Sequence, residues 1–89
     1  INPNFIKIDA ESSEYEILKG MTNILKYARP IISIEVGDMD IPGVPSSAEL
    51  INFMVSRRYQ PYEFLDGRFK VHQAKDRYTY GNILFIPER

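Results

Sequence analysis

Hydrophobic positions along the chain alternate between short continuous runs and a helically spaced ladder. Residues 5–9 (FIKID) form a run rich in β-branched residues that ends in a carboxylate, and residues 31–36 (IISIEV) form a second apolar run. Continuous runs of this kind predict buried strands of a parallel sheet that is covered on both faces. Between them, apolar residues recur with the spacing of one buried helical stripe, which predicts a helix that ends before Pro30: Ile17, Leu18, Met21, Ile24, Leu25 and Ala28.

Two capping patterns mark where helices begin. Ser13 is followed three residues later by Glu16, and Ser46 by Glu49, so that each pair can satisfy free backbone N–H groups. The second pattern predicts a helix near residues 46–58 with this apolar side: Leu50, Ile51, Phe53, Met54 and Val55. Gly20 lies inside the first helix at a cost of about 1 kcal/mol relative to alanine, so we expect a close backbone approach to the sheet there.

The rest of the chain has the pattern of strands joined by turns. Residues 62–65 are strand-like, Asp66-Gly67 is a strong turn signal, and residues 69–71 either return as a partner strand or extend the first strand beyond a bulge. Residues 78–86 predict a last strand.

The order of these elements predicts an α/β fold, β-α-β-α-β-β with an antiparallel last strand, which is half of a doubly wound sheet. Right-handed crossovers that run in one direction place both helices on the same face. We therefore expect the opposite face to be covered by something outside this chain.

Composition narrows the class of protein. The chain has 89 residues, 44% of them apolar and 26% charged, which fits one domain or part of one. It lacks cysteine, so disulfides and thiolate metal sites are excluded, and a cytoplasmic location is the default expectation. A net charge of -1 with dispersed basic residues predicts no nucleic-acid binding, and the apolar runs are too short to span a membrane. Because the sequence enters a strand pattern soon after Ile1, we expect a piece of a longer domain.

Acidic residues cluster where the first two strands end. Ligands of open α/β sheets bind at the carboxyl ends of the strands, and that edge would collect Asp9 and Glu11 from the first strand and Glu35, Asp38 and Asp40 from the second. The alternative for the loop residues is that they cap helices or stay solvated, and we expect Glu35 to have a partner. A metal site built from Asp9, Glu35 and a loop aspartate is conceivable, but no spacing is diagnostic and none is predicted.

One histidine and four tyrosines are the remaining candidates for chemistry. His72 has no nucleophile motif around it, and a lone histidine is more often a surface or hydrogen-bonded residue than a catalytic base. Tyr59, Tyr62, Tyr78 and Tyr80 either frame an acceptor pocket or pack in the core, and packing is favoured.

Residues 5–21, FIKIDAESSEYEILKGM, resemble the motif F-[IL]-K-[IL]-D-[VT]-E-G-x-E-x-x-[VL]-L-x-G of the FkbM-type methyltransferases. The residues that match in register are Lys7, Asp9, Glu11, Glu14, Leu18 and Gly20. The segment from Arg29 to Glu35 and the N-x-L-F-I-P run from Asn82 to Pro87 are also similar to that family. Ala10 and Ser12 depart from the pattern, which has a branched residue and a glycine at these positions. Because Ser12 can reshape the turn beside the substrate, the family's usual acceptor and activity do not transfer directly to this chain.

The resemblance implies a Rossmann-like domain that transfers a methyl group from S-adenosylmethionine to a hydroxyl of a sugar or natural product. It implies that Asp9 and Glu11 are catalytic, with Asp9 orienting or deprotonating the hydroxyl, and that Glu35 and Asn82 bind the substrate. The glycine-rich turn that holds the cofactor would lie upstream of Ile1. We therefore expect residues 1–89 to be the C-terminal portion of the domain, inactive without the missing N-terminal half or a second copy of the chain.

A different class of function is also consistent with the pattern. An uncovered apolar sheet face is typical of an interface, so the chain could be a non-catalytic assembly or binding module that pairs through this face. A third possibility, a receiver- or flavodoxin-like fragment, is not supported, because the sequence contains neither a phosphate-binding loop nor another signature of those folds.

Overall fold

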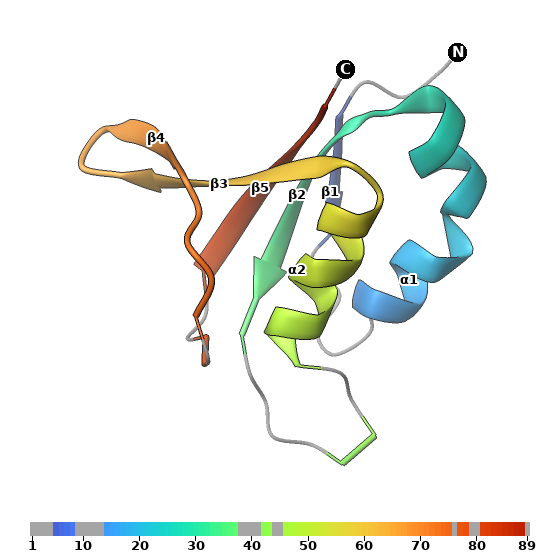
Figure 1. Ribbon diagram of the computed structural model, residues 1–89, viewed down its shortest axis with the longest axis horizontal. Coiled ribbons are helices and arrows are strands. Elements are labelled where there is room, and N and C mark those ends of the chain that lie inside the picture. The colour runs from blue at the N-terminus through green and yellow to red at the C-terminus, as the bar shows by residue number, and fades with distance from the viewer. Residues whose placement is uncertain are drawn as a thin grey trace.

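The computed structural model describes residues 5–8, 14–37, 42–43, 46–75, 77–78 and 81–88. They form a mixed α/β fold with a five-stranded sheet (Figure 1). The strands are β1 (Phe5–Ile8), β2 (Ile31–Val36), β3 (Tyr59–Leu65), β4 (Arg68–Val71) and β5 (Gly81–Pro87). The helices are α1 (Glu14–Gly20), the π-helix η1 (Ile24–Ala28) and α2 (Ser47–Ser56).

The sheet has the strand order β1-β2-β5-β3-β4. Strands β1 and β2 are parallel, while β5 is antiparallel to both of its neighbours, β2 and β3. Strand β3 therefore runs in the same direction as β2, although β5 separates the two. The predicted antiparallel last strand is confirmed.

The two possibilities for residues 62–71 are resolved as a hairpin. Strands β3 and β4 pair antiparallel, with Phe64 opposite Phe69. The turn residues Asp66 and Gly67 have φ angles of 53° and 77°, the left-handed pair that a two-residue hairpin turn requires. Strand β3 begins at Tyr59, earlier than the pattern predicted, because Tyr59 and Gln60 already pair with β5.

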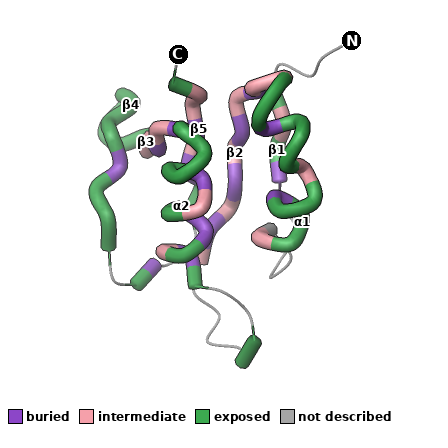
Figure 2. Tube along the Cα trace, turned by 45° about the vertical axis from the view of Figure 1, so that its right-hand side comes forward, coloured by how far each residue is buried: buried purple, intermediate pink, exposed green. Residues whose placement is uncertain are grey.

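One face of the sheet carries the core. Ile6, Ile32, Phe85 and Pro61 are register partners across four strands, so they share a face, and Ile32 and Phe85 are fully buried. Both helices pack on this face (Figures 1 and 2). Their buried contributions to the core are Leu18, Leu25, Leu50, Ile51 and Met54.

The opposite face, which we call the open face, carries no helix of the part that the structure describes. Its central row is Lys7, Ser33, Leu84, Tyr62 and Val71, which are register partners across all five strands. Burial along β2 alternates between buried and half-buried residues instead of being continuous. The expected uncovered face is thus present, and within this chain β2 is fully covered on one face only.

The predicted first helix is present, but it is interrupted at Met21 and ends as a π-helix. Helix α1 ends at Gly20, where Met21 N–H bonds the Leu18 carbonyl in a tightened turn, and the chain then re-forms as a π-helix whose last bond runs from Arg29 N–H to the Ile24 carbonyl. Leu18 and Leu25, seven residues apart, are both fully buried as expected, whereas their neighbours Ile17 and Ile24 lie at the flank of the buried stripe and are 36% and 38% exposed.

Gly20 does not have the role that the sequence suggested. A Cβ placed on it would meet no atom within 4 Å, so no close approach to the sheet requires a glycine among the residues described. Its weak helix propensity instead coincides with the end of α1.

The start of the second helix is confirmed. Ser46 Oγ accepts a hydrogen bond of 3.2 Å from Glu49 N–H, the first half of the expected capping box. The first capping pattern falls on Ser13, which lies outside the described residues. On the apolar side of α2, Leu50, Ile51 and Met54 are buried, whereas Val55 is half exposed.

Candidate functional site

Two of the four predicted site residues are described by the structure, and they lie side by side. Glu35 near the end of β2 and Asn82 near the start of β5 are direct register partners on the open face. Asp9 and Glu11, the predicted catalytic residues, lie outside the described residues, as do Asp38 and Asp40 of the loop after β2.

Glu35 and Asn82 are available for a ligand. Glu35 is half-buried and Asn82 is exposed. Within the part of the chain that the structure describes, neither side chain makes a hydrogen bond or ion pair, so the expectation that Glu35 has a partner is wrong. The carboxylate accepts up to four hydrogen bonds, and the amide both donates and accepts. Together they can bind a hydroxyl-bearing molecule from two neighbouring strands.

A hollow of about 310 Å³ lies beside Asn82 on the open face. Its polar lining is Ser33, Asn82 and the partly buried Tyr62, and its apolar lining is Phe5, Phe64, Phe69 and Leu84. Phe64 and Phe69 pack edge to face, with ring centroids 5.0 Å apart, and each is about 60% exposed. Such a combination of apolar walls and a few polar groups is typical of a surface that contacts another molecule or another part of a domain.

The tyrosines divide between core and hollow. Tyr59 and Tyr78 are buried, in agreement with the favoured packing role, whereas Tyr62 lines the hollow. Tyr80 lies outside the described residues.

His72 is the centre of a buried hydrogen-bond network that the sequence pattern did not reveal. Its side chain is 1% exposed, with Nδ1 2.6 Å from Glu63 Oε2 and Nε2 2.7 Å from the Tyr78 hydroxyl. Lys75 N–H donates to that hydroxyl at 3.0 Å. The interpretation of His72 as a hydrogen-bonded residue is confirmed, but its partners lie nine residues before it and six after it, on other segments of the fold, with no recognised motif spacing.

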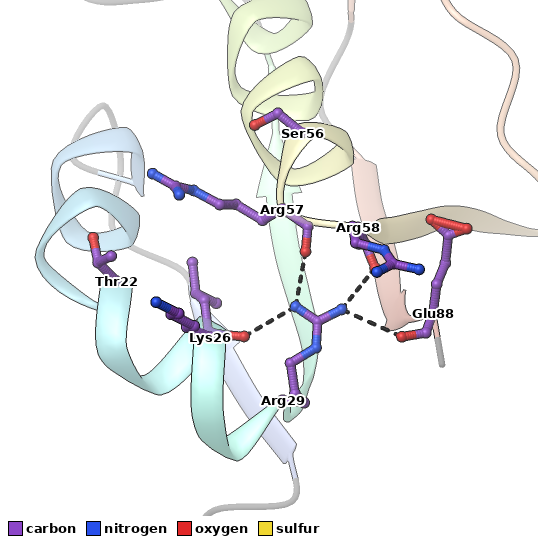
Figure 3. Close-up of a pocket in the computed structure, with 8 residues that line it drawn as sticks. Thr22, Lys26, Arg29, Ser56, Arg57, Arg58 and Glu88 are labelled. Atoms are coloured by element: carbon purple, nitrogen blue, oxygen red, sulfur yellow. Dashed lines mark hydrogen bonds between the residues drawn. The ribbon is translucent and has the colours of Figure 1, made fainter.

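A separate cavity of about 460 Å³ lies at the other edge of the sheet, lined by Thr22, Leu25, Lys26, Arg29, Ser56, Arg57, Arg58 and Glu88 (Figure 3). Arg29 precedes β2, and Arg57 and Arg58 precede β3, so the cavity lies at the amino ends of these parallel strands. Ligands of open α/β sheets bind at the carboxyl ends. This cavity contains none of the predicted site residues, and its cations lie at the C-terminal ends of η1 and α2, where they complement the helix dipoles.

Within this cavity, Arg29 donates hydrogen bonds to four backbone carbonyls of three segments. Its Nη1 donates to the Leu25 and Arg57 carbonyls at 3.0 and 2.7 Å, and its Nη2 donates to the Arg58 and Glu88 carbonyls at 2.8 and 3.5 Å (Figure 3). The guanidinium also lies 4.7 Å from the centre of the Tyr59 ring.

Tyr59 is also held by a hydrogen bond of its own, in which its hydroxyl donates to the Pro30 carbonyl at 2.7 Å. Burial raises the pKa of Tyr59 above its ordinary 10.0, and the nearby Arg29 charge lowers it by a smaller amount. Arg29 and Tyr59 therefore form a structural junction and are distant from the carboxyl edge.

Metal-ligand clusters and membrane-spanning helices are both absent from the described residues. No three histidine, aspartate or glutamate side chains there are grouped to hold a metal ion. No described helix is long and apolar enough to cross a membrane.

Comparison with known proteins identifies the family. The family model of the methyltransferase FkbM domain matches residues 2–61, which is more than half of the chain. The chain belongs to the FkbM methyltransferase domain family. No curated protein and no solved structure matches it.

The FkbM match covers the sheet from β1 to the start of β3, together with both helical segments. It includes Glu35 and the motif around Asp9, and it ends before His72 and Asn82. The resemblance inferred from the sequence is thereby confirmed, and it supports methyltransferase activity over the alternative of a non-catalytic module.

Proposed function

We propose that this FkbM domain segment is the acceptor-binding part of a methyltransferase that uses S-adenosylmethionine and methylates a hydroxyl of a sugar or natural product. The observation that carries the proposal is the family match over residues 2–61, which includes the D-x-E motif at Asp9 and Glu11. The pairing of Glu35 with Asn82 across β2 and β5 supports an acceptor site at the same end of the sheet.

The topology supports a Rossmann-like domain. Strands β1, β2 and β3 share one direction, and the last strand, β5, is inserted antiparallel between β2 and β3. This arrangement agrees with half of a doubly wound sheet that ends in an antiparallel strand. The other half of such a sheet would supply the glycine-rich turn at which the cofactor binds.

The described residues contain no glycine-rich turn of the kind at which such cofactors bind. The two described glycines with positive φ, Gly43 and Gly67, lie in the loop after β2 and in the β3–β4 turn. The proposal therefore assigns no cofactor contact to a described residue. S-adenosylmethionine, when bound, supplies the methyl group on a sulfonium centre.

The roles proposed for this chain concern the acceptor. Asp9 accepts the proton of the acceptor hydroxyl or orients it, and Glu11 supports the same edge. Glu35 and Asn82 hold neighbouring hydroxyls of the acceptor by accepting and donating hydrogen bonds. Alignment of the acceptor oxygen with the methyl group is the main contribution expected of the protein, and general-base help is typically worth ~10²- to 10⁴-fold.

The open face is the surface on which the proposal places the remainder of the domain or a second copy of the chain. Phe5, Phe64, Phe69 and Val71 are each more than half exposed there. Burial of this apolar surface would favour association, at about 25 cal/mol per Å² buried.

Calorimetric titration with S-adenosylmethionine and with its demethylated product tests the proposal. The titration compares the 89-residue chain with a longer protein that carries the same segment after an upstream half-domain. We expect binding to the longer protein alone. Binding to neither contradicts the proposal and favours the assembly module, and binding to the short chain contradicts the upstream cofactor site.

A variant of the longer protein separates binding from chemistry. Asp9→Asn keeps the size of the side chain and removes its basicity. We expect it to bind the cofactor as before and to transfer methyl groups ~10²- to 10⁴-fold more slowly. Unchanged turnover would exclude Asp9 as the base.

A further inference from the structure

The Glu63–His72–Tyr78 network lies where two strands of the sheet separate. Strand β3 pairs with β5 from Tyr59 opposite Pro87 to Tyr62 opposite Leu84. Beyond that point β3 continues into the hairpin with β4, and the first three residues of β5 have only β2 as a strand neighbour. The network begins at Glu63, the residue that follows the last of these pairs.

The network connects both sides of this fork. Glu63 belongs to β3, His72 directly follows β4, and Tyr78 precedes β5 by three residues. The His72 backbone N–H also donates to the Pro61 carbonyl at 2.9 Å. This bond extends the β3–β4 pairing by one residue, so the His72 backbone is fixed to β3 while its side chain reaches Tyr78 on the segment that leads to β5.

The chemistry of the partners fixes the direction of the hydrogen bonds. A carboxylate only accepts, so His72 Nδ1 carries a proton and donates to Glu63. In the neutral ring Nε2 then accepts from the Tyr78 hydroxyl, whose oxygen accepts from Lys75 N–H. The tautomer follows from the partners rather than from observed hydrogens.

We propose that His72 is a positioning residue for the acceptor site: through Tyr78 it fixes the start of β5, and so holds Asn82 opposite Glu35. That the Glu35–Asn82 pair binds an acceptor rests on the proposed function. The coupling between the His72–Tyr78 hydrogen bond and the start of β5 is a property of the fold and is independent of that function.

Hydrogen exchange measured by NMR tests the coupling. Tyr78→Phe keeps the ring and removes the hydroxyl that His72 and Lys75 contact. We expect the amides of residues 81–83 to exchange about tenfold faster than in the unaltered chain, and those of residues 85–87 to change little, because a lost hydrogen bond opens structure locally. Tyr27→Phe, at a tyrosine that is 72% exposed, is the matched control.

Two variants of His72 separate positioning from simple loss of stability. His72→Phe removes both ring nitrogens, and His72→Gln restores one group that can accept from Tyr78. We expect the glutamine variant to recover much of the protection of residues 81–83. Equal loss of protection across all of β5 in every variant, or no loss in Tyr78→Phe, overturns the proposal.

Activity then distinguishes this inference from the proposed function. In the longer protein, Tyr78→Phe should raise KM for the acceptor several-fold and leave cofactor binding unchanged. If hydrogen exchange is coupled but the longer protein transfers no methyl group, the proposed function is contradicted and the effect of His72 on β5 stands. If methyl transfer occurs and Tyr78→Phe leaves KM unchanged, the proposed function stands and the positioning role is contradicted.

Discussion

Glu35 and Asn82 face each other across the antiparallel pairing of β2 and β5, on the face of the sheet that no described helix covers. Directly opposed residues on one face have Cβ atoms ~5 Å apart, close enough for both side chains to contact one small polar group. Neither side chain bonds another described side chain, so the polar groups of both are available to a ligand.

Substitution of this pair should therefore affect the acceptor and leave stability unchanged. For Glu35→Gln and Asn82→Ala we expect the free energy of unfolding to change by less than about 0.5 kcal/mol. In the active enzyme, kcat/KM for the acceptor should fall by about tenfold for each, the equivalent of one hydrogen bond. Denaturant unfolding and a methylation assay measure the two quantities.

Gln60→Ala is the control for these two variants, because Gln60 lies on the same face next to Ile86 and away from the carboxyl edge. It should change neither quantity. A loss of stability of 2 kcal/mol or more in Asn82→Ala would mean that the residue is structural.

Arg29 should be more important for stability than any other charged side chain of the cavity in Figure 3. Its two terminal nitrogens bond carbonyls of η1, the turn after α2 and the end of β5. Arg29→Ala removes all four bonds and should lower the free energy of unfolding by about 2 kcal/mol in urea titrations. Arg29→Lys should recover little, because an ammonium cannot reproduce the planar fork.

Arg57→Ala is the matched control for Arg29, because the Arg57 side chain is exposed and, among the described residues, its one interaction is with the Phe53 ring, whose centre lies 5.0 Å from the guanidinium. Its effect should stay below about 1 kcal/mol. Equal effects of the two alanine variants would contradict the role of Arg29 as a junction.

Tyr59 should make stability depend on pH in the alkaline range. Burial raises its pKa in the folded chain, with Arg29 opposing, so above pH 10.0 the unfolded chain loses the proton first. The contribution is fully present below that pH, and the free energy of unfolding falls by up to ~1.4 kcal/mol per pH unit until the folded pKa is passed. Urea midpoints from pH 8 to 11 measure this slope.

Tyr59→Phe should lack this part of the slope, although it loses the bond to the Pro30 carbonyl and about 1 kcal/mol at neutral pH. The difference between the two proteins should therefore narrow as pH rises. A constant difference would show that Tyr59 ionises equally easily when folded, and the exposed Tyr27→Phe serves as control.

The parts of the fold that the sequence predicted are those set by local pattern. The β2 run, the Ser46 cap and the Asp66-Gly67 turn each depend on neighbours within a few residues. The insertion of β5 between β2 and β3 depends on pairing across more than twenty residues, which no local pattern specifies. The same applies to His72, whose partners come from two other segments.

The candidate site divides in the same way. Glu35 and Asn82 were identified separately, by resemblance to the family, and their direct opposition appears only in the register of β2 and β5. The helical ladder did not distinguish the fully buried Leu18 and Leu25 from the partly exposed Ile17 and Ile24. Helical spacing marks the centre of a buried stripe, whereas tertiary packing decides how far the core extends around its flanks.

The role of Gly20 at the end of α1 can be tested directly. It ends α1 with no positive φ, and a Cβ at this position would meet nothing within 4 Å. Gly20→Ala should therefore raise the free energy of unfolding by about 0.5–1 kcal/mol, through better helix propensity and a less flexible unfolded chain. Gly67→Ala, at a φ of 77°, should lower it by about 1 kcal/mol. Urea titrations of the two variants measure both signs, and destabilisation by Gly20→Ala would instead show that the glycine is needed for a contact beyond the described residues.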